Sequence, residues 1–131
     1  MQGTLKLALT DEIMYPALSM GNHRIVLIKA ITLKVVECNI PVMKDWTYFI
    51  HKTQNVNVHG WVISNAQTGL CHTKPRDSVD DTLQALHTFK LSKPLDECIS
   101  DWHQNELDFK YALKHYDYDT SKMNEEIKIN E

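Results

Sequence analysis

The sequence predicts an α+β domain, built as an antiparallel sheet of four or five strands with two C-terminal helices packed on one face. Three observations support this prediction. Apolar residues alternate with polar ones, or form β-branched runs, in the first half of the chain. A hairpin turn signal lies near the middle, and apolar residues recur at helical spacing in the second half. The length of 131 residues is that of one domain.

The N-terminal part of the chain predicts two extended segments separated by a break. Residues 4–9 read as a strand, because three leucines alternate there with polar or small residues. For residues 10–20 we expect a turn or a broken helix, because Pro16 lies too deep for a regular helix. Residues 24–38 are rich in β-branched side chains and predict either two strands or one bent strand, which Pro41 ends.

A three-stranded antiparallel meander is predicted next, with strands at 45–53, 60–65 and 70–73. In the first of these strands, alternate side chains belong to opposite faces of the sheet. The turn between the last two strands begins at Asn65, and Gly69 supplies a residue that tolerates positive φ.

Two helices complete the predicted domain. Asp77 or Ser78 is the expected N-cap of the first, and Asp80 and Asp81 in its first turn suit the helix dipole. Pro94 lies near the first turn of the second helix. The apolar stripe of this helix, which we expect to belong to the core, consists of Leu95, Ile99, Trp102, Phe109, Leu113 and Tyr116.

The predicted order of three strands and a helix, from Trp46 to Phe89, is similar in topology to double-stranded RNA-binding domains and to HicB-antitoxin-like domains. The similarity covers about a third of the chain. It includes a loose likeness of residues 78–83 to the helix start that follows the third strand. RNA-binding domains use a basic helix start, whereas Asp77, Asp80 and Asp81 occupy it here.

The chain is predicted to form a single domain at 1–116, followed by a polar, mobile tail at 117–131. We expect a cytoplasmic protein without a membrane partner, because no apolar run is long enough to span a bilayer and no signal peptide is visible. Three cysteines are an odd number for a disulfide framework, which favours reduced thiols.

Metal and catalytic chemistry are not favoured by the spacing of His and Cys. No pair has the close spacing of a zinc site, although His51, His59 and His72 could meet across the meander. Cys71 with His51 or His59 could form a nucleophilic dyad, which makes a Cys/His-dependent enzyme the least favoured alternative. The four glycines are isolated, so a phosphate loop is not expected. We therefore expect no catalytic residues, no metal and no cofactor.

Charge is unevenly distributed along the chain. Residues 1–76 carry eight Lys and Arg against four Asp and Glu, a net charge of +4. Residues 77–131 carry six Lys against thirteen Asp and Glu, a net charge of −7. We expect a small non-enzymatic intracellular binding protein, a regulator or inhibitor of the phage or plasmid accessory type, that occludes a protein partner. The predicted partner-binding residues are acidic and lie on the second helix: Asp96, Glu97, Asp101, Glu106 and Asp108.

A nucleic-acid-binding module is the alternative. Aromatic side chains on a sheet stack on bases while nearby cations contact phosphates. The residues that would do this are Lys44, Lys52, Lys74, Arg76, Trp46 and Trp61. The negative charge of the whole chain opposes this alternative, because it repels phosphates.

Overall fold

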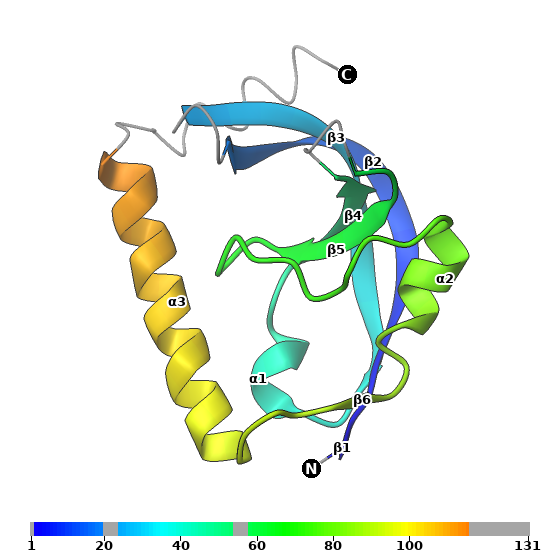
Figure 1. Ribbon diagram of the computed structural model, residues 1–131, viewed down its shortest axis with the longest axis vertical. Helices are drawn as coiled ribbons and strands as arrows, with labels where there is room; N and C mark the ends of the chain where they lie inside the picture. Colours follow the sequence, from blue (N-terminus) through cyan, green and yellow to red (C-terminus); the bar gives the residue numbers. More distant parts are fainter. Residues whose placement is uncertain (1, 20–23, 54–57, 116–131) are drawn as a thin grey trace.

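The computed structural model describes residues 2–19, 24–53 and 58–115. Its main feature is a four-stranded antiparallel sheet in the order β2-β3-β4-β5 (Figure 1). The strands are β2 (Leu5–Ser19), β3 (Arg24–Cys38), β4 (Tyr48–Lys52) and β5 (Trp61–Asn65). A short separate pair joins β1 (Gln2–Gly3) to β6 (Phe89–Lys90).

Three helices accompany the sheet in the described residues: α1 (Pro41–Lys44), α2 (Val79–Gln84) and α3 (Leu95–His115). The predicted α+β class and the sheet of four or five strands are confirmed, and α1 is an additional helix. None of the described helices is long and apolar enough to cross a lipid bilayer. The predicted tail at 117–131 lies outside the described residues.

The predicted break at 10–20 is wrong, because β2 continues through this segment to Ser19. Pairing with the equally long β3 supplies the backbone partners, and the register shifts near Thr10 and Asp11. There the Thr32 hydroxyl accepts from the Asp11 amide at 3.0 Å. Pro16 is accommodated because β2 is an edge strand, where a missing amide proton disturbs no second neighbour. Residues 24–38 form one strand, which is one of the two structures that the sequence predicts.

The predicted third strand of the meander, at 70–73, does not form as a regular strand. The segment runs beside β5 through isolated bridges, one of them at Cys71. The Ile63 amide donates a hydrogen bond of 3.1 Å to the Thr73 hydroxyl rather than to a backbone carbonyl. Pro75 then removes a backbone donor. The strand order on which the likeness to RNA-binding and HicB-antitoxin-like domains rested is therefore incomplete in the described residues.

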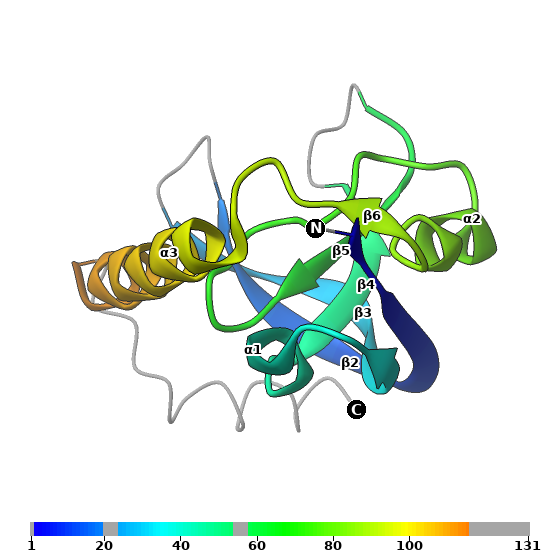
Figure 2. The ribbon, with the colours of Figure 1, turned by 90° about the horizontal axis from the view of Figure 1, so that it is seen from below.

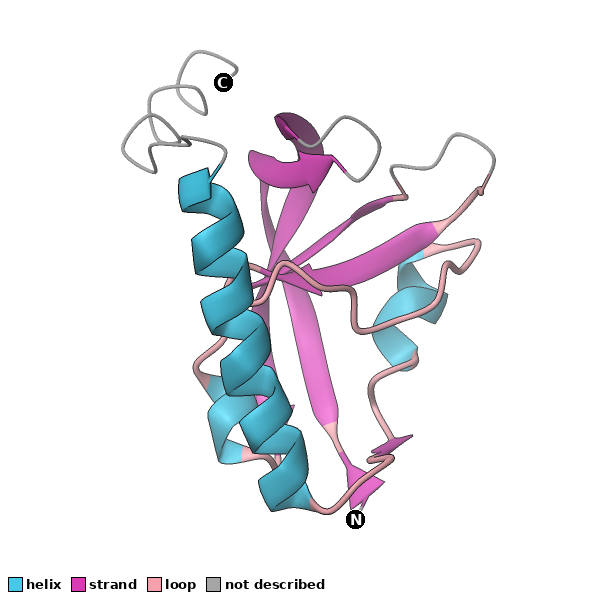
Figure 3. Ribbon diagram, turned by 60° about the vertical axis from the view of Figure 1, so that its left-hand side comes forward, coloured by secondary structure: helices cyan, strands magenta, loops and turns pink. Residues whose placement is uncertain are grey.

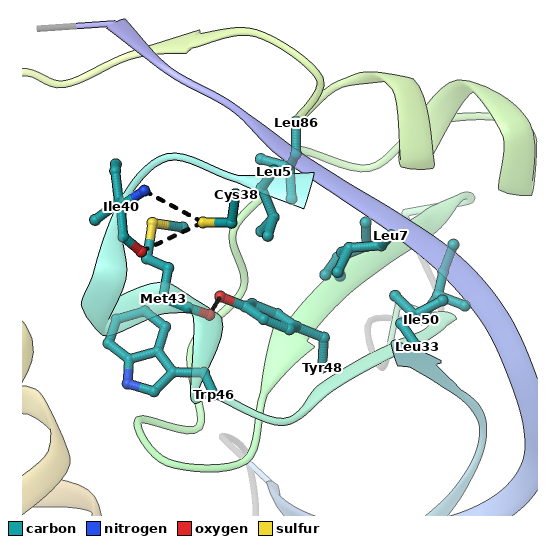
Figure 4. Close-up of a cluster of buried hydrophobic side chains, with 11 residues drawn as sticks. Leu5, Leu7, Leu33, Cys38, Ile40, Met43, Trp46, Tyr48, Ile50 and Leu86 are labelled. Carbon is teal, nitrogen blue, oxygen red and sulfur yellow. Dashed lines mark hydrogen bonds between the residues drawn. The ribbon is translucent and has the colours of Figure 1, made fainter. Parts of the chain in front are cut away.

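The sheet buries apolar side chains on both faces, as alternation along β4 predicts. Tyr48 and Ile50 enter the main cluster, whereas Phe49 packs with Tyr15 and Ala30 on the other face. The Tyr48 hydroxyl donates to a carbonyl of α1 at 2.7 Å, which satisfies the buried phenol (Figure 4). The main cluster comprises Leu5, Leu7, Leu33, Cys38, Ile40, Met43, Trp46, Tyr48, Ile50, Ile63 and Leu86.

The last two helices lie at opposite ends of the sheet (Figure 2). Ser78 caps α2, as predicted, by accepting from the Asp81 amide at 3.1 Å. Both α2 and α3 contribute partly buried side chains to the main cluster, Leu83 from the first and Trp102 from the second. The long helix α3 runs alongside the sheet and α1 (Figure 3).

Candidate functional site

The five acidic residues predicted to bind a partner do not share one surface of α3. Successive residues of a helix are rotated by about 100°, so Glu97, Asp101 and Asp108 lie within about 40° of one another. Asp96 is rotated by about 100° from Glu97, and Glu106 by about 180°. Burial agrees with this geometry, because Glu106 is half-buried while the other four are exposed. We call Glu97, Asp101 and Asp108 the acidic stripe.

Two of the five acids are engaged in ion pairs. Glu106 lies 3.5 Å from the Lys110 ammonium, so it stabilises the helix itself. Asp101 accepts a hydrogen bond from Lys93 at 2.8 Å, and this bond raises the pKa of Lys93. Asp108 accepts from the Gln104 amide at 2.9 Å. The charge of the acidic stripe is therefore partly balanced by Lys93 at its N-terminal end.

An apolar pair lies beside the acidic stripe. Leu107 is 59% exposed and Tyr111 is 72% exposed. They are four residues apart and hence neighbours on one side of the helix. Helical rotation places them within about 100° of Asp108, on the side away from the sheet. We call the acidic stripe and this pair the outer face of α3.

Sequence reasoning missed the apolar pair because both residues fall outside the predicted apolar stripe. The spacing of four residues between Leu107 and Tyr111 was visible in the sequence and could have identified them.

The expectation that the apolar stripe of α3 belongs to the core is met only in part, because Leu95 and Trp102 pack against the main cluster but stay half-buried. Leu95, Ile99, Trp102 and Phe109 all retain partial exposure. Among the described side chains of α3, Cys98 alone is buried. The side chain of Leu113 and the whole of Tyr116 lie outside the described structure.

Two aromatic contacts hold the side of α3 that faces the sheet. The Trp102 ring meets Trp46 edge to face, with centroids 5.3 Å apart. Further along, the Phe109 ring lies against Gly69, where a Cβ atom would collide with it. Gly69 has φ +68°, a conformation that glycine adopts without strain. The helix is thus docked along one side, while Leu107 and Tyr111 on its outer face are exposed.

The structure separates the residues of the nucleic-acid alternative. Trp46 is 9% exposed and lies between His72 and Trp102, so it offers no surface for a base. Lys44 ends α1, which precedes β4, whereas Lys52 lies at the far end of that strand. Lys74 is exposed in the segment that follows Cys71.

A smaller basic and aromatic group does form. The Lys52 ammonium lies 5.6 Å from the ring centroid of Trp61, in a cation–π contact. The Trp61 backbone pairs with Arg76 through two hydrogen bonds of 2.7 and 3.1 Å. Lys52, Trp61 and Arg76 therefore meet at one edge of the sheet, although Lys52 already covers part of the indole.

The three histidines considered as metal ligands do not converge. His51 is buried with its Nε2 2.8 Å from the Ser64 hydroxyl, whereas His72 lies among Trp46 and Tyr48. His59 is exposed at the start of the segment before β5. Within the described residues, no three His, Cys, Asp or Glu side chains form a metal-binding group.

His72 belongs to a closed hydrogen-bond network. The fully buried Asn65 contacts His72 Nε2 through its amide nitrogen. Its carbonyl oxygen accepts from the Thr68 amide at 2.7 Å and the Thr68 hydroxyl at 2.9 Å. Burial lowers the pKa of His72 to about 4, so the imidazole is neutral near pH 7. This network fixes the turn that contacts Phe109.

Comparison with known proteins identifies no relative of this chain. No protein-family model matches the chain, and no curated protein and no solved structure matches it.

Proposed function

We propose that the chain is a non-enzymatic protein-binding module, a regulator or inhibitor that occludes its partner, and that the outer face of α3 is its contact surface. The observation that supports this most is the exposed Leu107 and Tyr111 pair beside three acidic side chains. Large apolar side chains four residues apart on an exposed helix are the anchors used when a helix docks into a groove.

The two kinds of side chain on the outer face have different roles in this proposal. Leu107 and Tyr111 supply buried apolar area on docking, and tyrosine is among the residues that dominate binding energies. The acidic stripe supplies orientation and faster association. The partner is therefore a protein with an apolar groove bordered by Lys or Arg. A nucleic acid is disfavoured at this face, because the stripe repels phosphates.

Site-specific photo-crosslinking in lysate of the source cells tests the proposal. A crosslinker replaces Gln104, which is exposed between the stripe and the apolar pair. A matched control places it at Val36, an exposed β3 residue on the sheet. We expect one protein adduct from position 104 that is absent from position 36 and lost on combining Leu107→Ala with Tyr111→Ala. Adducts equal at both positions, or unchanged by the double substitution, would contradict the proposal.

The nucleic-acid alternative is supported by the meeting of Lys52, Trp61 and Arg76. A gel-shift assay with random single- and double-stranded DNA and RNA at about 0.15 M salt tests it. Micromolar binding that Lys52→Glu abolishes, and that Glu12→Lys on β2 leaves unchanged or tightened, would favour this alternative over the outer face of α3.

A further inference from the structure

The hydrogen bonds around Asn65 fix the protonation state of His72. Asn65 Oδ1 accepts from the Thr68 amide at 2.7 Å and from the Thr68 hydroxyl at 2.9 Å. A backbone amide only donates, so this contact sets the orientation of the Asn65 side chain and turns its amide nitrogen toward His72 Nε2. His72 Nε2 is therefore the acceptor, and the ring proton lies on Nδ1. A proton at Nε2 would place a donor against a donor.

His72 is joined to α3 through a series of ring contacts. The imidazole stacks on the Trp46 ring, with centroids 5.7 Å apart. The Trp46 ring in turn meets Trp102 of α3 edge to face, at a centroid distance of 5.3 Å. Trp102 also packs against the main cluster. A displacement of the imidazole therefore acts on a contact that holds α3 against the rest of the protein.

The turn that Asn65 closes forms a second connection to α3. The Gly69 amide donates to the Asn65 carbonyl at 3.0 Å, and Gly69 lies against the Phe109 ring of α3. The Ala66 amide donates to the Thr47 carbonyl at 2.9 Å, so the turn is also held to the segment that leads into β4. Loss of the side-chain bonds of Asn65 therefore loosens the surface on which Phe109 packs.

The surroundings of His72 do not favour a proton on its ring. The titratable groups that flank its partners are Lys44, Asp45, Tyr48, Cys71, His103 and Glu106. Lys44 and Asp45 are exposed and opposite in charge, and Glu106 is engaged with Lys110 at 3.5 Å. Within the described residues, no acidic side chain forms an ion pair with His72. Burial then lowers the pKa of His72 to about 4.

We propose that His72 is a pH-sensitive switch for α3: protonation at Nε2 breaks the bond to Asn65, opens the turn at 65–69 and releases α3 from the sheet. Release and protonation favour each other, because an imidazole outside this network accepts a proton more readily. The released helix exposes the side that is half-buried when docked, which carries Leu95, Ile99, Trp102 and Phe109. This switch does not require the proposed role of the outer face of α3.

The balance between docked and released α3 shifts within a defined range of pH. In the released state His72 titrates near its ordinary pKa of 6.5, and in the docked state near 4. The ratio of released to docked helix therefore rises as the pH falls below 6.5, by about thirtyfold between pH 7.5 and pH 5. Below pH 4 both states are protonated, and the ratio no longer changes.

Two buried cysteines distinguish release of α3 from opening of the core. Cys98 on α3 and Cys38 at the end of β3 are each 7% exposed, and each sulfur donates to a backbone carbonyl, at 3.5 and 3.3 Å respectively. Cys98 becomes accessible when α3 leaves the sheet, whereas Cys38 becomes accessible when the main cluster opens. Cys71 is exposed and is replaced by serine in every protein tested.

The experiment labels the folded full-length chain with an aromatic disulfide of the dithiodipyridine type, which reacts with thiols in acid. Each rate is divided by the rate for the same cysteine in urea at the same pH, which removes the intrinsic pH dependence of the thiol. We expect faster labelling of Cys98 than of Cys38 at every pH. The corrected rate of Cys98 should rise about thirtyfold from pH 7.5 to pH 5, because it follows the released fraction.

Two substitutions remove the switch in opposite ways. His72→Gln keeps an acceptor for Asn65 but has no charge to gain, so it should abolish most of the rise at Cys98. Asn65→Asp keeps an acceptor for Thr68 and presents a carboxylate oxygen to His72, so a protonated imidazole is bound instead of repelled. It should abolish the rise as well. Protection of Cys38 confirms that each variant is folded.

Two results would overturn the proposal. Equal corrected rates for Cys98 and Cys38 would show that α3 leaves the sheet only when the whole protein unfolds. An unchanged pH dependence of Cys98 in His72→Gln or in Asn65→Asp would show that His72 does not control the release of α3.

Discussion

The sheet and α3 bury their side chains to very different extents. In the sheet, Tyr48, Ile50 and Ile63 are completely inaccessible to solvent, and both faces are covered. In α3, a helix of 21 residues, the side facing the sheet stays half-exposed. Leu95 and Trp102 pack against the main cluster, and Phe109 packs against Gly69.

This difference separates the part of the molecule that determines stability from the part that is available for binding. Buried apolar area provides most of the folding free energy, so the sheet contributes most of the stability of the protein. A helix that packs on the sheet mainly through half-buried side chains adds less, and Leu107 and Tyr111 on its outer face are largely exposed. The comparison can be tested with identical substitutions in the two regions.

Matched isoleucine substitutions should show the largest difference. Ile50→Ala in β4 should lower the free energy of unfolding by about 4 kcal/mol, because the side chain is fully buried and leaves a cavity. Ile99→Ala in α3 should lower it by about 1 kcal/mol, because that side chain is half-exposed. Urea denaturation measures both. Equal losses would show that α3 belongs to the core after all.

Much of the sheet could be predicted from the sequence, because alternation depends on local geometry. The opposite orientations of Tyr48 and Phe49 and the cap at Ser78 both follow from local patterns. The continuation of β2 past Pro16 could not be predicted in this way. It depends on pairing with β3 and on an edge position, which are properties of the tertiary structure.

The candidate sites could be predicted from the sequence only in part. The helical pattern of α3 showed which side is apolar, but not how closely Phe109 approaches the sheet. The sequence suggests a pairing of Cys71 with His51, but it does not indicate that Ser64 lies between them. Its position follows from the register of β4 with β5 and from the bridge at Cys71, which residue types alone do not specify.

Acidification should destabilise the protein through the imidazoles of His51, which is buried, and of His72, which is partly buried. In the unfolded chain His72 is protonated below about pH 6.5, whereas in the folded chain its pKa is about 4, so it is protonated only below about pH 4. The unfolded state thus holds more protons in this window, and stability falls as the pH drops through it. His51, whose pKa burial also lowers, acts in the same direction.

The loss attributable to His72 between pH 7.5 and pH 5 should be about 2 kcal/mol. Urea denaturation at both pH values measures it. His72→Gln, which keeps an acceptor for Asn65, should reduce the loss. An identical pH dependence for wild type and His72→Gln would contradict the buried, neutral state of His72.

Gly69→Ala should loosen α3 more than it destabilises the sheet. The left-handed backbone conformation costs about 1–2 kcal/mol with a Cβ atom. That atom would also displace the Phe109 ring. We expect faster amide hydrogen exchange along α3, with the central amides of β4 unchanged.

A double-mutant cycle with Phe109→Ala separates the two effects of this substitution. In the absence of the ring, Gly69→Ala should retain only its backbone cost. Additive losses of stability would show that Gly69 and Phe109 do not contact each other.

Charge reversal on the outer face should have the smallest effect on stability and the clearest effect on binding. Glu97→Lys and Asp108→Lys should each change the free energy of unfolding by at most about 0.5 kcal/mol, because both side chains are exposed. Thermal unfolding measures this. Both should slow association with the protein captured by crosslinking, because they invert the field that attracts a basic groove.

Asp80→Lys on α2 is the matched control, since it makes the same charge change on an exposed side chain outside α3. It should slow association less than Glu97→Lys or Asp108→Lys. The difference should shrink as salt rises, because the screening length falls from about 30 Å at 0.01 M to about 10 Å at 0.1 M. If all three substitutions slow association equally, the net charge of the protein steers the partner and the acidic stripe has no particular role. If none does, the contact rests on Leu107 and Tyr111 or lies elsewhere, and the crosslinks from position 104 decide which.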